Sequence, residues 1–175
     1  MFTQTMMLTY LWKTFKVVGG IIFILLLTRT FIIETGRVNG VSMLPNYFDN
    51  QKFFVNKFAL LVALPERGQV VHANDPVHND LLIKRIIGLP GEQVRIFQNV
   101  VSITDTEGNV ITLGEPYLIP NTITRVWNQT SSDYPVLGPD EYFVLGDNRE
   151  ASADSRHFGP LKRSDIIGLV IPQRN

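Results

Sequence analysis

Two residues in the sequence could form a catalytic pair, Ser42 and Lys84. A serine hydroxyl is a weak nucleophile until an adjacent base takes its proton, and a neutral lysine can do this in place of a histidine. Ser42 lies in the stretch Asn-Gly-Val-Ser-Met-Leu-Pro at 39–45, and Lys84 opens the stretch Lys-Arg-Ile-Ile-Gly-Leu-Pro-Gly at 84–91. The pair therefore favours a hydrolase with a serine nucleophile and a lysine base.

A third segment completes the pattern. It reads Gly-Asp-Asn-Arg-Glu-Ala-Ser-Ala-Asp-Ser-Arg at 146–156. The three segments, taken in this order, are far more specific than any one of them alone. Together they resemble the bacterial type I signal peptidase family, membrane-bound serine proteases that remove signal peptides from exported proteins. The resemblance extends from about Arg29 to about Gly168.

The resemblance implies a role for each residue near the nucleophile. Ser42 would attack the scissile carbonyl to form an acyl-enzyme, while Lys84 takes its proton and later activates water. Gly40 stands two positions before the nucleophile, where some members carry a serine whose hydroxyl helps hold the oxyanion. Glycine has no such hydroxyl, so the Ser42 backbone N–H is the expected donor, and Gly40 would allow close backbone approach. Asn46 stands where the family usually has threonine.

The resemblance also assigns supporting residues in the third segment. Ser152 matches the family serine that orients the lysine amine by a hydrogen bond. Asp154 and Arg156 match an ion pair beside the site. Composition alone would instead make this segment a polar surface loop.

Lys84 can act as a base only when it is neutral, although a free lysine has a pKa of about 10.4. Burial disfavours the ammonium and lowers the pKa. Ile83, Ile86 and Ile87 could supply an apolar setting, whereas a charged partner would defeat it. On residue type alone, a surface lysine paired with an acid is the alternative.

Three apolar residues flank the nucleophile and the base, and by resemblance they line the pockets for the substrate residues one and three before the cut. They are Val38, Met43 and Ile83. Such pockets would accept alanine and exclude larger side chains. Their alternative role is core packing.

Two other groups of residues are weaker candidates for a functional site, a Ser-His-Asp triad and a metal site. Asp154, Ser155 and His157 are sequence neighbours, whereas the partners of a catalytic triad come from separate segments. His72, Asp75 and His78 are too loosely spaced for a metal site and fit solvated loop residues better. The mechanism requires no metal and no organic cofactor.

Composition narrows the class of protein. The chain has 175 residues, which suits one domain plus an anchor. Its formal net charge of +0 gives no electrostatic reason to expect a nucleic acid partner. The chain has no cysteine, which excludes thiol catalysis, disulfides and thiolate metal sites.

An apolar run near the N-terminus predicts a membrane anchor. The run from Val17 to Leu27 is too short for a bilayer core, which needs about 20 residues. Extended to 15–33 it spans roughly 28 Å, with Lys16 and Arg29 near its ends. A cleavable signal peptide and a buried core helix are the alternatives. We expect an anchor at 1–34 and a catalytic domain at 35–175.

The orientation of the anchor follows from flanking charges. Lys13 and Lys16 precede the span, which favours a cytoplasmic N-terminus and a catalytic domain on the outer face of the cytoplasmic membrane. Arg29 and Arg37 follow it, so the charge bias by itself is weak.

Beyond Gly36 the sequence predicts a mainly β domain built on an antiparallel sheet. Short β-rich runs alternate with turn sequences such as Pro-Glu-Arg-Gly and Leu-Pro-Gly. The expected strands are 51–58, 69–72, 81–87, 93–103, 110–113, 122–127, 141–145 and 166–171.

The sequence thus predicts a single-pass membrane serine endopeptidase with a Ser42/Lys84 pair. Its partners would be the lipid bilayer and exported preproteins with small residues before the cut. A specialised relative that matures a pilin or conjugation protein, or the related mitochondrial inner-membrane peptidase, would share the pair. A catalytically silent binding module would not need to keep Ser42, Lys84 and Ser152 together.

Overall fold

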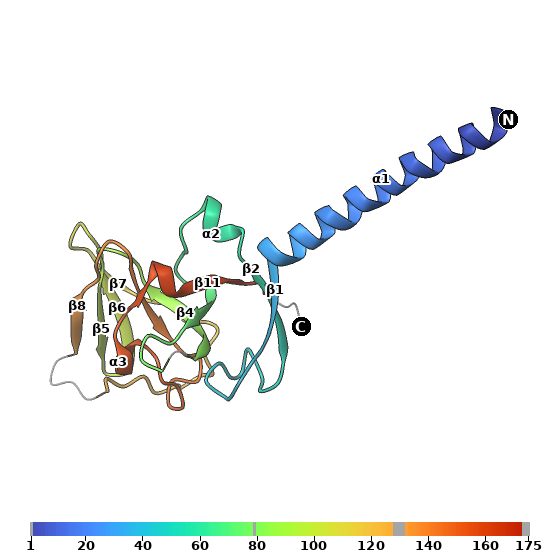
Figure 1. Cartoon of the computed structure of the whole chain (residues 1–175). Coiled ribbons are helices and arrows are strands. Elements are labelled where there is room, and N and C mark those ends of the chain that lie inside the picture. The colour runs from blue at the N-terminus through green and yellow to red at the C-terminus, as the bar shows by residue number, and fades with distance from the viewer. Residues whose placement is uncertain (1, 79, 128–131, 173–175) are drawn as a thin grey trace.

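A long N-terminal helix leaves a β-rich body (Figure 1). The computed structural model describes residues 2–78, 80–127 and 132–172. In chain order the elements are α1 Phe2–Phe31, β1 Ile33–Arg37, β2 Lys52–Asn56, α2 Ala59–Val62, β3 Val70–Asn74, β4 Leu81–Gly88, β5 Gln93–Phe97, β6 Val100–Thr104, β7 Val110–Thr112, β8 Asp133–Val136, β9 Glu141–Leu145, α3 Ser155–Phe158, β10 Leu161–Lys162, the 3₁₀ turn η1 Arg163–Asp165, and β11 Ile166–Val170.

The strands form two antiparallel sheets. One has seven strands in the order β1-β2-β11-β3-β4-β9-β10, and the other has four in the order β7-β6-β5-β8. Neighbouring strands pair antiparallel in both sheets. The prediction of a mainly β, antiparallel domain after one apolar helix is confirmed.

The helix α1 passes into the sheet with almost no linker. Its stretch Thr9–Leu26 is long and apolar enough to cross a membrane, and it is exposed along its whole length. The helix ends at Phe31, two residues before the end of the predicted span, and β1 begins at Ile33. The sheet therefore starts inside the segment 1–34 that the sequence assigned to the anchor.

Two predicted strands differ from the structure. The run 93–103 is a hairpin, because Gln98 and Asn99 both take positive φ (48° and 66°) and turn the chain between β5 and β6. The run 122–127 forms no strand, and β8 follows it instead. Apolar alternation predicted the strand content but could not reveal these turns.

The outer strand β2 buries one face, whereas β3, β4 and β9 in the interior of the same sheet are buried on both faces. In β2, Phe53 and Val55 point inward while Lys52 and Phe54 are exposed, which is the period of two that a strand with one solvated face requires. Phe53 and Val55 pack with Met43 and Ile83 in one core cluster. This cluster lies directly beneath the segment that carries Ser42.

Candidate active site

The structure brings Ser42 and Lys84 together. Lys84 Nζ donates to Ser42 Oγ at 2.9 Å and to the backbone oxygen of Ile83 at 3.0 Å. Lys84 comes from β4, which lies between β3 and β9 inside the seven-stranded sheet, and is 4 % exposed, whereas Ser42 comes from the turn after β1. A hydroxyl and a buried amine at this distance can exchange a proton.

Burial lowers the pKa of Lys84 to about 8. The cause is loss of water around the ammonium, and the negative charges of Asp154, Asp75 and Asp147 offset it in part. Among the described residues, no carboxylate lies within ion-pair distance of the amine. The amine therefore has the unpaired, apolar setting that a lysine base requires.

Arginines engage two of the nearby carboxylates. Arg156 donates to Asp154 through Nε and Nη2, both at 2.8 Å, and both side chains are buried. Arg85 donates to Asp147 in the same two-pronged way, at 2.8 and 2.6 Å. The sequence pointed to the first pair but gave no signal for the second.

Ser152 does not make the expected contact. Its side chain is buried, but its Oγ has no hydrogen-bond partner, so the bond to the Lys84 amine is absent from this structure. The amine instead uses Ser42 and the backbone oxygen of its own neighbour, Ile83. A local backbone acceptor of this kind leaves no mark in the sequence.

Gly146 lets the third segment approach the nucleophile. A Cβ on this residue would lie 2.2 Å from Ser152 Oγ and 2.5 Å from the backbone oxygen of Ser42. Asn148 N donates to that same oxygen at 2.9 Å. Asn46 Nδ2 adds a second link, because it donates to Asp147 Oδ2 at 2.9 Å. The two segments are thus joined through their backbones as well as their side chains.

Gly40 is required by its backbone conformation. Its φ is +89°, in the region that favours glycine. Its N–H donates to Asp49 Oδ1 at 2.8 Å, and a Cβ would have no heavy atom within 4 Å. The reason for glycine here is therefore the turn, and close packing by neighbouring protein atoms is not needed to explain it.

A groove of about 150 Å³ adjoins the Ser42–Lys84 pair. Of the three residues predicted to line the substrate pockets, Val38 and Ile83 line this groove, and Met43 does not, because it is fully buried in the core. Phe53, Leu81, Leu82 and His72 line it as well.

The prediction of His72 as a solvated loop residue is wrong. It lies buried in β3, its ring packs edge-on against Phe53 with 5.4 Å between ring centroids, and burial lowers its pKa. Its Nδ1 has no hydrogen-bond partner. The expected strand 69–72 did include His72, but β3 is buried on both faces, so no alternation of apolar and polar residues marked its side chain as buried.

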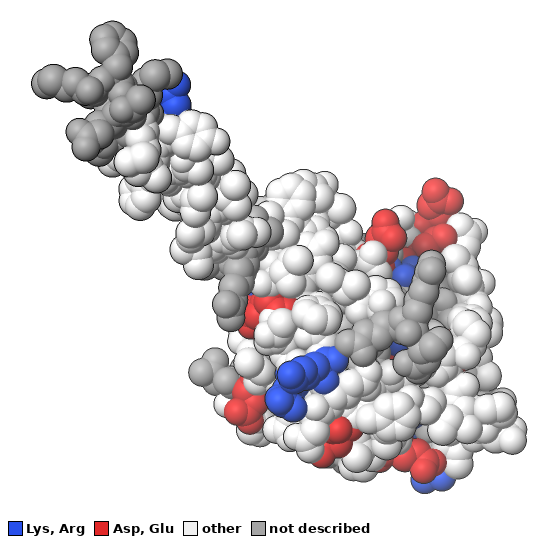
Figure 2. Space-filling view, turned by 90° about the vertical axis from the view of Figure 1, so that its right-hand side faces the viewer, with Lys and Arg blue, Asp and Glu red and all other residues white. Residues whose placement is uncertain are grey.

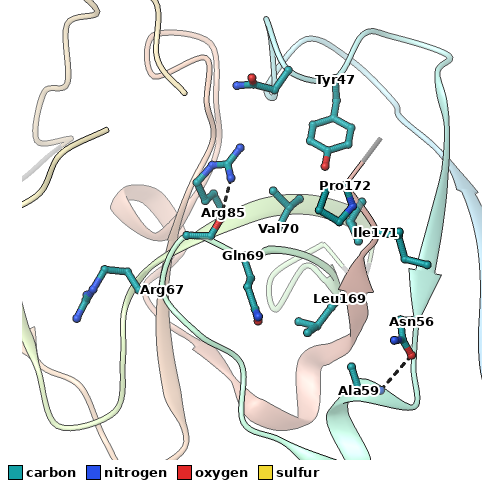
Figure 3. A pocket seen from close by; sticks show the side chains of 13 residues that line it. Tyr47, Asn56, Ala59, Arg67, Gln69, Val70, Arg85, Leu169, Ile171 and Pro172 are labelled. Carbon is teal, nitrogen blue, oxygen red and sulfur yellow. Dashed lines mark hydrogen bonds between the residues drawn. The ribbon is translucent and has the colours of Figure 1, made fainter. Parts of the chain in front are cut away.

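A larger pocket lies elsewhere. It has a volume of about 810 Å³ and is lined by residues around Tyr47, Asn56, Gln69 and Leu169 (Figure 3). Arg85 reaches it, but Ser42 and Lys84 are not among its lining residues. Size alone would therefore point away from the candidate catalytic pair.

The structure does not bring together the two alternative sites, the metal site at His72, Asp75 and His78 and the triad of Asp154, Ser155 and His157. Within residues 2–78, 80–127 and 132–172, no group of three or more histidine and acidic side chains could hold a metal ion. Ser155 Oγ accepts from the backbone N–H of Val144 at 2.9 Å and is buried. Its hydroxyl is thus bound to the backbone of β9 instead of to His157.

Comparison with known proteins gives one consistent result. The family model for signal peptidase, peptidase S26, matches residues 11–172. Signal peptidase I V of Bacillus subtilis (strain 168) is 29 % identical over 90 % of this chain and 96 % of its own length. Signal peptidase I P of Bacillus subtilis subsp. natto is 34 % identical over 85 % of this chain and 80 % of its own. The crystal structure of a signal peptidase I from Enterococcus faecalis V583 covers 62 % of this chain and 97 % of its own, with a TM-score of 0.50 and 28 % identity.

Gly146→Ala should destabilise the protein, because its methyl group would overlap atoms of Ser152 and Ser42. Overpacking of this kind costs about 1–3 kcal/mol in the free energy of unfolding. Urea denaturation measures it, with Gly114→Ala as the control, since a Cβ there meets nothing within 4 Å. Equal stability of the two variants would contradict the close approach.

Proposed function

The chain belongs to the signal peptidase family, peptidase S26, and from this premise we propose that it removes signal peptides with Ser42 as nucleophile and Lys84 as general base. Its named relatives are signal peptidases I, so it is a serine-protease-type hydrolase. The observation that carries the assignment of roles is the 2.9 Å contact between the buried Lys84 amine and the Ser42 hydroxyl.

Each proton in the proposed reaction has a place. Neutral Lys84 takes the Ser42 proton as Oγ attacks the scissile carbonyl, and the resulting ammonium gives that proton to the leaving amine. Lys84 then deprotonates a water, which attacks the acyl carbon, and the ammonium returns that proton to Ser42 Oγ as the acyl–oxygen bond breaks, which restores the free enzyme. The Ser42 backbone N–H is the proposed oxyanion donor.

The groove supports a preference for small side chains. Its volume is only about 150 Å³, and Val38, Ile83 and Phe53, all buried and apolar, line the part of it near the Ser42–Lys84 pair, with polar residues of β1 along the rest. We propose that the substrate residues before the cut enter here, and that α1 anchors the enzyme in the cytoplasmic membrane with the catalytic domain on the outer face. The exposed, apolar Thr9–Leu26 stretch supports this anchoring.

Ser42→Ala and Lys84→Arg should each reduce preprotein cleavage by about 10⁴-fold or more, because loss of one member of a catalytic pair disables the unit. Arginine stays protonated, so it cannot replace the base. Cleavage by purified protein in detergent measures the loss. Ser164→Ala and Lys162→Arg, both at exposed positions, are matched controls. A rate within tenfold of wild type in either test variant would refute the assignment.

The rate should rise with pH through about 8, because the pKa of Lys84 is lowered to about that value and only the neutral amine accepts the serine proton. Below this pH the ammonium predominates, and the rate should fall about tenfold per pH unit. A profile of kcat/KM against pH measures the limb. A flat profile from pH 6 to pH 10 would exclude Lys84 as the base.

Ile83→Ala should relax the preference for alanine before the cut, since it enlarges the groove. It should also lower the rate at neutral pH, because water would then reach the Lys84 amine and raise its pKa. A substrate series with Ala, Ser, Val and Leu at that position measures the preference. Ile96→Ala, buried in the other sheet, controls for lost stability. Unchanged selectivity in Ile83→Ala would remove this residue from the pocket.

A further inference from the structure

A second cleft, of about 340 Å³, adjoins the segment that carries the nucleophile. Within this segment the groove is lined by residues up to Ser42, whereas the cleft is lined by Leu44, and also by Asn148 of the third segment. Asn148 contacts the nucleophile turn directly, because its backbone N–H donates to the Ser42 oxygen at 2.9 Å and its Nδ2 donates to the Val41 oxygen at 3.2 Å. We call this cavity the Asn148 cleft. It borders the turn on which Ser42 lies but shares no lining residue with the groove.

One wall of the Asn148 cleft comes from a long connection between two strands. β7 ends at Thr112 and β8 begins at Asp133, and the described part of the connection, 113–127, forms no helix or strand. Residues 119–123 of this connection line the cleft. A long irregular connection in a compact domain is usually either functional or disordered.

Hydrogen bonds and an ion pair hold this connection in place. The Tyr117 oxygen accepts from Asn46 Nδ2 at 2.8 Å, which ties the connection to the nucleophile turn. Arg149 of the third segment has a fully buried side chain, donates to Thr124 Oγ1 at 2.9 Å and forms an ion pair with Glu115. The connection is therefore held against both segments, and the cleft is already formed before a ligand enters it, as is usual for binding sites.

The lining of the cleft combines apolar side chains with paired charges. Leu44, Ile119 and Ile123 supply the apolar part, and Ile119 is 58 % exposed. The buried charged residues of the lining, Asp147 and Arg149, are each paired with an opposite charge. These residues therefore present apolar surface, and no uncompensated charge, to a ligand.

Glu150 carries the charge that stays exposed in the cleft. It lines the cleft and forms no ion pair within residues 2–78, 80–127 and 132–172. On the face that Figure 2 shows, charged side chains stand in small, separate groups, and the formal net charge of the whole chain is +0. A charge preference for a ligand would therefore be set locally, by a residue such as Glu150, and not by a broad field over the surface.

We infer that the Asn148 cleft binds the segment of the preprotein that follows the cut, with Glu150 favouring basic over acidic residues there. The inference rests on the proposed function, which places the residues before the cut in the groove. A substrate cut by Ser42 passes the nucleophile and continues beyond it, and the cleft borders the same turn. An extended chain advances about 3.4 Å per residue, so a cleft at this turn would receive the first few residues after the cut. An apolar side chain among them would pack against Ile119 and Ile123.

Disulfide crosslinking in the full chain tests where the substrate lies. The sequence has no cysteine, so each variant carries a single thiol. Ile119→Cys and Glu150→Cys report on the cleft, Leu81→Cys reports on the groove, and Val136→Cys is the control at an exposed position in β8. Each is combined with Ser42→Ala, so that the preprotein stays uncut. The preproteins carry one cysteine each, at successive positions from five before to five after the cut, and are mixed with the enzyme in detergent under mild oxidation.

We expect Ile119→Cys and Glu150→Cys to crosslink to cysteines after the cut, Leu81→Cys to crosslink to cysteines before it, and Val136→Cys to crosslink to neither. Crosslinks at Leu81→Cys with none at the two cleft positions would overturn the inference about the cleft and leave the proposed function standing. If Leu81→Cys also failed to crosslink, the proposed use of the groove would fall, and the cleft with it. Because two cleft positions are measured, misfolding of one variant does not decide the result.

Cleavage kinetics of the enzyme with Ser42 intact test the charge preference. With lysine in place of glutamate at positions two to four after the cut, wild-type kcat/KM should be about two- to fivefold higher, because an exposed ion pair contributes only modestly. The difference should lie in KM, since the contact is the same in the ground state and the transition state, and it should shrink in about 1 M salt. Glu150→Lys should reverse the order of the two substrates, whereas Glu107→Lys, in the exposed turn between β6 and β7, should keep it. An unchanged order in Glu150→Lys would overturn the role of Glu150 in the cleft.

Discussion

The Lys84 amine is held out of water, and no carboxylate among the described residues is close enough to pair with it. Two of the nearby carboxylates are each paired with an arginine, so the amine keeps this unpaired setting. Asp154 and Asp147 both raise its pKa, yet each is bound by an arginine through two hydrogen bonds. An opposite charge at close range can shift a pKa by about 1–3 units. Neutralising the carboxylates therefore keeps the pKa of the proposed base near its operating range.

This arrangement explains why adjacent residues on β4 have different roles. Lys84 and Arg85 are both cationic and buried or nearly so, but Arg85 cannot lose its proton and instead binds Asp147. Asp147 also accepts from Asn46, which follows the nucleophile in the same turn. The ion pair thus connects the strand of the base to the segment of the nucleophile. The position of Ser42 depends on charges that take no direct part in the proposed chemistry.

The sequence predicted the proposed catalytic residues well, because the reaction requires particular residue types. It predicted the contacts of buried side chains less well, because these depend on the three-dimensional packing. Ser42 and Lys84 could be paired from the segments that carry them, although nothing local brings them together. The apolar run hid β1, because Ile33 extends the hydrophobic pattern of α1 into a strand. The surroundings of Ser152 and His72 depend on which side chains of other segments pack against them. The order of residues along the chain does not show this.

The short connection between α1 and β1 ties the proposed membrane anchor to the groove. Groove residues begin at Glu34, three residues past the helix, and continue along β1 to Ser42. A strand of the length of β1 spans about 16 Å at about 3.3 Å per residue. If α1 anchors the chain as proposed, a peptide extended beside β1 would run from the anchored end toward Ser42 over about that distance. The sheet register that fixes β1 against β2 would then also fix the distance between the anchor and the proposed nucleophile.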